Sequence, residues 1–147
     1  MLHTEIMEIL NKEEPADNTI ALSGYSGKKL IHALQSLTGL ASRSGEDIAY
    51  LEIGVFQGLT LTSVASSNPQ IQCFGVDNFS QFDPDDKNYS MVRSRLKEHT
   101  TGNGSIINED FEDALLSLKE HIGDKKIGVY FIDGPHDYRS QYLCLEY

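Results

Sequence analysis

The sequence predicts an α/β protein built on a doubly wound parallel β-sheet flanked by helices. Segments with helical spacing of apolar residues alternate strictly with short apolar runs along the 147 residues. The first run, residues 49–53, is almost continuously apolar, as expected for a parallel strand covered on both faces. Strict alternation is typical of parallel sheets, and a chain of this length fits one domain.

The same pattern gives the expected elements. Strands are predicted at residues 49–53, 71–76, 105–107 and 126–132, and helices at 30–41, 58–65, 89–99, 110–122 and from 139 onward. Asp110 is predicted to cap the helix that follows it, and Gly123 to end that helix. Residues 1–23 are expected to form a helical or irregular N-terminal segment, since Leu2, Ile6 and Leu10 share one side of a short helix.

Composition and charge exclude several classes of protein. A formal net charge of −10 argues against nucleic acid or an anionic membrane as the main partner, because both need a basic face. No apolar run approaches the roughly 20 residues of a membrane helix. Cys73 and Cys144 make neither a metal site nor a disulfide framework, so a reduced, cytoplasmic location is expected. The alternative interpretation of the charge is simply that acidic surfaces keep proteins soluble.

The stretch from Tyr50 to Leu61 organises the predicted site. It begins as a strand, breaks at Gly54 and restarts at Gly58 as a helix. Such a turn places backbone N–H groups at the carboxyl end of the strand, where open α/β sheets bind ligands.

Acidic residues follow the other strands at the same predicted edge. Asp77, Asp110 and Asp133 each come after a strand, and His136 lies three residues beyond the last of them. Asp77 follows Gly54 at roughly the 20-residue offset at which an acid accepts hydrogen bonds from ribose hydroxyls. The alternative for Asp77 is a solvent-exposed aspartate at a strand end. For His136 it is a turn histidine bonded to the backbone.

The glycine turn departs from the dinucleotide fingerprint G-x-G-x-x-G. Phe56 occupies the position where a second glycine would let a pyrophosphate approach. The expected ligand is therefore a nucleoside without a pyrophosphate, and S-adenosylmethionine meets that description.

Four segments resemble the motifs of class I S-adenosylmethionine-dependent methyltransferases, whose fold is Rossmann-like. Leu51–Gly58 resembles their E-x-G-x-x-x-G motif, Gly75–Asp77 their second motif and Asn108–Phe111 their third. Phe131–Tyr138 is similar to the I-D-G-x-H-x-Y segment of a small-molecule branch that includes macrocin- and mycinamicin-type sugar O-methyltransferases. The resemblance covers roughly residues 24–147.

The resemblance implies a role for each matching position. Glu52 and Gly54 would lie at the methionine end of the cofactor, and Gly58 would also bind the cofactor. Asp77 would bind the ribose, with Asn78 beside it. Asp110 and Phe111 would hold the adenine. Asp133 would be a divalent metal ligand, with Mg²⁺ as the expected ion, and His136 the catalytic base. The expected partner is a small-molecule acceptor with a reactive hydroxyl, and a homo-oligomer stays open.

The usual family fold has seven strands, and this chain supplies about four. Residues 24–147 are therefore expected to be the N-terminal, cofactor-binding part of such a domain, with weak cofactor binding and poor turnover on its own. Two other functions stay open, namely a nicotinamide-dependent oxidoreductase and a non-catalytic binding module with the same fold.

Overall fold

The computed structural model describes residues 1–12 and 22–147. The rest of the predicted N-terminal segment, residues 13–21, lies outside the described residues. The described elements are α1 (Leu2–Asn11), α2 (Lys28–Ser42), β1 (Ile48–Ile53), α3 (Leu59–Ser67), β2 (Gln72–Val76), α4 (Asn88–His99), β3 (Gly104–Ile107), α5 (Phe111–Leu116), α6 (Leu118–Ile122), β4 (Lys126–Ile132) and α7 (Tyr138–Glu146).

The strands form one parallel sheet in the order β3-β2-β1-β4. This confirms the predicted class, a Rossmann-like parallel sheet flanked by helices, with four strands in the described residues. The chain steps outward from β1 through β2 to β3, then crosses to the other side of β1 to form β4. The direction of winding therefore reverses between β1 and β4, and ligands bind at such a switch point in open α/β sheets.

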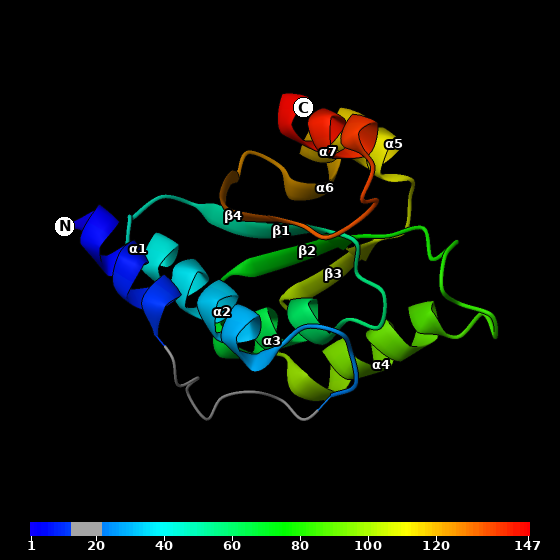
Figure 1. Cartoon of the computed structure of the whole chain (residues 1–147), viewed down its shortest axis with the longest axis horizontal. Coiled ribbons are helices and arrows are strands. Elements are labelled where there is room, and N and C mark those ends of the chain that lie inside the picture. Colours follow the sequence, from blue (N-terminus) through cyan, green and yellow to red (C-terminus); the bar gives the residue numbers. More distant parts are fainter. Residues whose placement is uncertain (13–21) are drawn as a thin grey trace.

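Helices cover both faces of the sheet (Figure 1). On one face, Leu34 of α2, Leu61 of α3 and Val92 of α4 pack against Tyr50 and Cys73. On the other face, Leu115 of α5, Ile122 of α6 and Cys144 of α7 pack against Leu51 and Phe74. All six residues of β1 are buried, which explains its continuous apolar sequence.

β4 is the least covered strand, since none of its seven residues is fully buried. It pairs with β1 alone among the described strands, and a bulge at Gly128 shifts the register between them.

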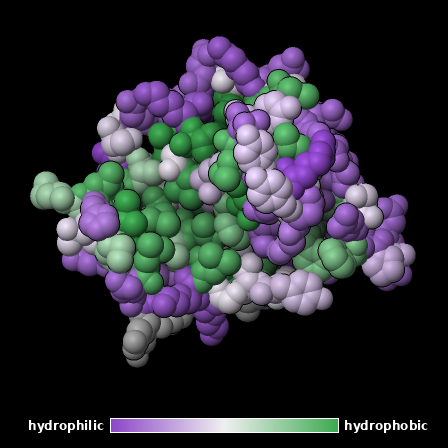
Figure 2. Space-filling model, turned by 45° about the horizontal axis from the view of Figure 1, so that its top comes forward, coloured by the Kyte–Doolittle hydropathy of each residue, from purple (hydrophilic) through white to green (hydrophobic). Residues whose placement is uncertain are grey.

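Hydrophobic residues reach the surface in the middle of one face of the molecule, with hydrophilic residues around them (Figure 2).

The structure has two helices where the sequence predicts one. The expected helix over 110–122 breaks at Ser117, which caps both α5 and α6. Asp110 does cap α5, because its side chain accepts the backbone N–H of Glu112 at 3.0 Å, and Gly123 ends α6 with φ +68°.

Within the described residues, no helix is long and apolar enough to cross a bilayer.

Candidate active site

A cavity of about 820 Å³ opens at the carboxyl ends of the strands. Its walls come from five places in the chain: the glycine turn after β1, the loops after β2, β3 and β4, and the segment before α2. The lining residues are Gly24–Ser26, Ile53–Gln57, Leu59, Thr60, Val76–Asn78, Ser80–Phe82, Glu109–Phe111 and Asp133–His136. The cavity thus lies at the switch point between β1 and β4.

Gly54 forms the closest approach between the ends of these two strands. Its φ of +92° lies in the left-handed region, and a Cβ there would meet the Asp133 carbonyl oxygen at 2.3 Å. Only glycine adopts this positive φ freely and, having no Cβ, avoids the clash with Asp133 without displacing the backbone. Gly54 therefore lets the turn pass directly over the end of β4, which brings the carboxylate of Asp133 into the same cavity.

Asp77 is bonded to the backbone of the glycine turn. Its Oδ2 accepts the N–H groups of Val55 at 2.9 Å and Phe56 at 2.8 Å, while its Oδ1 accepts the N–H of Phe79 at 2.7 Å. A carboxylate has about four acceptor positions, so one remains, on Oδ1. The predicted ribose carboxylate thus lies at the cavity, with room for one further donor in this arrangement.

The hydrogen bonds from the glycine turn to Asp77 also affect which ligands the turn can bind. In dinucleotide-binding turns, such N–H groups bind a pyrophosphate. Here two of them already bind the carboxylate of Asp77. The expectation that this turn does not bind a pyrophosphate is therefore supported by the Asp77 carboxylate as well as by the bulk of Phe56, which adopts φ +53°.

The loops after β2 and β3 supply the next predicted residues. Asn78 and Asp110 both line the cavity, as does the ring of Phe111. Asn78 accepts the N–H and the hydroxyl of Ser80 with its side-chain oxygen, which orients its amide. Asp110 caps α5 through Oδ1, and no hydrogen bond to its Oδ2 is seen among the described residues.

A family comparison adds to this geometry. Residues 51–147, more than half of the chain, match a family model described as "Methyltransferase domain". The chain belongs to this methyltransferase family. No curated protein and no solved structure matched it. The cavity described above is the one that the matched region builds, apart from the lining residues that precede α2.

Two residues predicted to bind the cofactor lie elsewhere in the methyltransferase. Glu52 is fully buried behind the cavity wall, where it accepts the Tyr50 hydroxyl at 2.7 Å and the Thr60 hydroxyl at 3.1 Å. Burial raises the pKa of Glu52 to about 8. Its link to the cavity is indirect, since Thr60 lines the wall.

Gly58 is the second of these residues. It precedes α3 with φ +78°, and a Cβ there would lie 2.9 Å from Cγ1 of Val92. It lets α4 pack against the start of α3, and it is not part of the cavity lining.

Asp133 and His136 both line the cavity. Nε2 of His136 lies 3.9 Å from Oδ1 of Asp133, which is an ion-pair distance and longer than a hydrogen bond. The His136 side chain is 83% exposed and Asp133 47%. The pair is therefore open to a ligand that enters from solvent.

The residues present do not fit a divalent metal. Mg²⁺ prefers near-octahedral oxygen coordination, often with two carboxylates. In the described part of the methyltransferase, no group of three or more histidine, cysteine, aspartate or glutamate side chains is placed to hold an ion. The expectation of magnesium at Asp133 finds no support in this arrangement.

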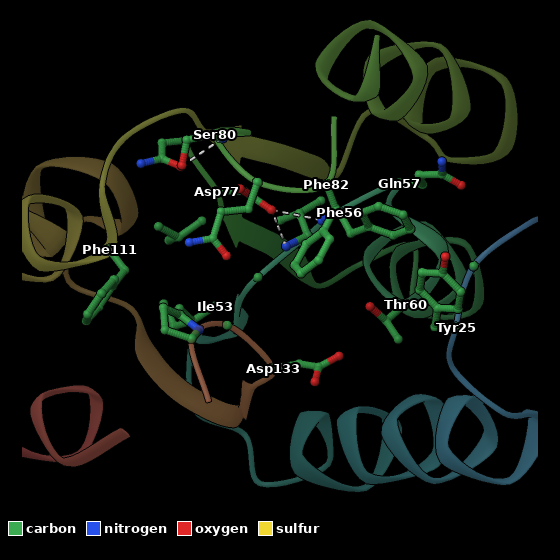
Figure 3. A pocket seen from close by; sticks show the side chains of 18 of the residues that line it. Tyr25, Ile53, Phe56, Gln57, Thr60, Asp77, Ser80, Phe82, Phe111 and Asp133 are labelled. Atoms are coloured by element: carbon green, nitrogen blue, oxygen red, sulfur yellow. Dashed lines mark hydrogen bonds between the residues drawn. The ribbon is translucent and has the colours of Figure 1, made fainter. Parts of the chain in front are cut away.

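The sequence analysis did not predict the aromatic wall of the cavity, which consists of Tyr25 and Phe56. Tyr25 and Phe56 stack with ring centroids 5.3 Å apart, and Phe82 lies exposed at the rim. Phe111 and Tyr25 lie on opposite sides of the cavity, with Asp77 between them (Figure 3). The sequence held one signal for the rim, namely phenylalanines within the polar loop after β2.

Proposed function

We propose that the methyltransferase transfers a methyl group from S-adenosylmethionine to a hydroxyl of a small molecule. The family implies this donor. The observation that carries the proposal is Asp77, a carboxylate that is bonded to the glycine turn at the switch point, keeps one acceptor position and lines a cavity of nucleoside size.

The donor's adenosine fits the side of the cavity formed by the loops after β2 and β3. Asp77 accepts a ribose hydroxyl at Oδ1, and Asn78 lies next to that sugar. Asp110 accepts the adenine amino group with the oxygen that does not cap α5, and Phe111 packs against the ring. The amino-acid half of the donor then extends past Gly54.

When bound, the donor supplies an electrophilic methyl group on a sulfonium, which the acceptor oxygen attacks in line. His136 would accept the hydroxyl proton as the acceptor oxygen gains the methyl group, and loss of the C–S bond would leave the donor as a neutral thioether. Asp133, 3.9 Å from the imidazole, stabilises the imidazolium by its negative charge.

The charge of the cavity supports a cationic nucleoside over a nucleotide. Four carboxylates line it, and no lysine or arginine is among the described lining residues. A pyrophosphate would meet like charge there, whereas a sulfonium meets opposite charge. This counts against a nicotinamide-dependent oxidoreductase.

Calorimetry with S-adenosylhomocysteine tests donor binding, with NADH as the competing ligand. We expect measurable affinity for the first and none for the second. The reverse result would favour the oxidoreductase. Affinity for neither would favour a non-catalytic module.

The ribose contact is tested separately with adenosine, 2′-deoxyadenosine and 3′-deoxyadenosine. With one acceptor position left on Asp77, one of the two deoxy analogues should bind less tightly than adenosine, by about tenfold. In Asp77→Asn that difference should shrink, and in Asp85→Asn, an exposed aspartate of the same loop, it should persist. An equal difference in all three proteins would refute the ribose role of Asp77.

The base is tested by His136→Gln on a panel of hydroxylated sugars and polyketides. We expect methyl transfer to fall by about 10²–10⁴-fold, with unchanged affinity for S-adenosylhomocysteine. Unchanged turnover would remove His136 from the mechanism.

A further inference from the structure

The chain segment before α2 lies across the cavity, and we name residues 22–27 the strap. Gly24, Tyr25 and Ser26 of the strap line the cavity. A Cβ on Gly24 would lie 2.7 Å from the Cβ of Leu59, so the strap rests directly on the first turn of α3. This contact joins a segment outside the matched family region to the centre of the site.

One side chain of α4 fastens the strap. Nη1 of Arg95 donates to the carbonyl oxygens of Ser23 at 2.9 Å and Gln57 at 2.6 Å, and Nη2 donates to the Ser23 hydroxyl at 2.7 Å. The Ser23 hydroxyl in turn donates to the Gln57 side chain at 3.2 Å. The planar guanidinium thus bonds to both the strap and the glycine turn. Arg95 lies 72 residues after Ser23 in the sequence.

Arg95 and Asp77 together set the aromatic wall. Asp77 fixes Phe56 through its backbone N–H, and Arg95 fixes the strap two residues before Tyr25. The two rings stack at 5.3 Å with an interplanar angle of 20°. Tyr25 is 93% exposed even with this ring contact, so its position depends on how the strap is held.

The wall lies opposite the side where Phe111 meets the adenine in the proposed function (Figure 3). The donor's other half carries an ammonium, a carboxylate and the sulfonium, and aromatic faces attract its two cationic groups. The geometry points to Arg95 as a positioning residue that holds the strap so that Tyr25 and Phe56 cover the amino-acid half of the donor. This inference rests on the proposed function.

The first experiment follows the strap without any ligand. The sequence contains no tryptophan, so Tyr25→Trp introduces a single tryptophan, on the strap. In that background, Arg95→Met should speed the local decay of Trp fluorescence anisotropy. Arg93→Met is the matched control, because Arg93 lies on the same helix but contacts the ring of Tyr89 instead. Equal decay in both variants would overturn the role of Arg95.

The second experiment uses two ligands that differ in the half that the wall covers. With Tyr25 intact, Arg95→Met should weaken S-adenosylhomocysteine binding on the order of fivefold and leave adenosine within about twofold. Arg93→Met should change neither affinity. Equal losses for both ligands, or no loss for either, would overturn the inference.

The two experiments separate the inference from the proposed function. If the wild-type chain binds neither ligand, the proposed function and the covering of the donor both fail. The anisotropy decay then still decides whether Arg95 positions Tyr25.

Discussion

Oδ2 of Asp77 accepts the backbone N–H of Phe56 at 2.8 Å, which joins the end of β2 to the turn after β1. The contact supports a backbone conformation that phenylalanine seldom adopts, since Phe56 has φ +53°. A side chain predicted to bind a ligand therefore also has a structural role, and the two roles must be measured apart.

Replacing Asp77 should cost stability as well as affinity. Asparagine presents a single acceptor oxygen, so Asp77→Asn loses at least one of three charge-assisted bonds to the backbone. We expect the free energy of unfolding to fall by about 2–3 kcal/mol, measured by urea denaturation. Asp85→Asn should stay within about 0.5 kcal/mol of wild type. A wild-type value for Asp77→Asn would mean that the turn holds its shape without the carboxylate.

Gly54 and Gly102 form a matched pair for separating backbone strain from steric clash. Their φ values are +92° and +90°, but a Cβ meets the backbone of Asp133 at Gly54 and nothing within 4 Å at Gly102. Alanine at Gly102 should cost about 1–2 kcal/mol from strain alone. Alanine at Gly54 should cost clearly more, or prevent folding, as read by denaturation and by circular dichroism. Equal costs would show that the ends of β1 and β4 can separate freely.

Glu52 predicts an unusual pH dependence of stability. Burial raises its pKa in the folded chain to about 8, above the ordinary value of 4.5. Between these two values the unfolded chain releases the proton and the folded chain keeps it. The contribution of Glu52 to stability is therefore complete below pH 4.5, falls as the pH rises, and is lost above about pH 8. The slope is at most about 1.4 kcal/mol per pH unit.

The difference between wild type and Glu52→Gln isolates this effect. Urea denaturation at several pH values should show wild type losing stability relative to Glu52→Gln from pH 5 to pH 8. Glu98→Gln, at an exposed glutamate, should run parallel to wild type. A wild-type advantage that grows with pH would mean that Glu52 is ionised in the folded protein.

Magnesium should leave the protein unchanged. Asp133 has His136 beside it, and within the described residues no further metal-binding side chains complete a site. About 5 mM MgCl₂ should shift the melting temperature by less than about 1 °C relative to EDTA at matched ionic strength. A saturable rise in melting temperature that Asp133→Asn abolishes would restore the metal site expected from the sequence.

The sequence predicted the sheet well because its strands are rich in apolar residues. The runs in β1 and β2 are mostly buried, the run in β4 is partly buried, and such runs are visible without a structure. The break at Ser117 escaped prediction because apolar spacing continues across it from Leu115 to Leu118. The periodicity of apolar residues indicates which side chains face the core, but it does not reveal a single residue at which the helical backbone breaks.

Several of the predicted residues line the cavity and others do not, for a related reason. Residues that follow a strand end, such as Asp77 and Asp133, do reach the cavity. Glu52 lies within β1, so its side chain points to a face of the sheet, toward Thr60 of α3. The strap was beyond prediction because its position depends on Arg95, 72 residues from Ser23, and no local pattern encodes that contact.

The carboxylate on the glycine turn also bears on competition among metabolites. A nucleoside and its nucleotide share the same base and sugar, and differ in the phosphate. At this turn the backbone N–H groups that a phosphate would need already donate to the carboxylate of Asp77. Free ATP, however abundant, should therefore be a poor inhibitor of this methyltransferase, and adenosine a better one.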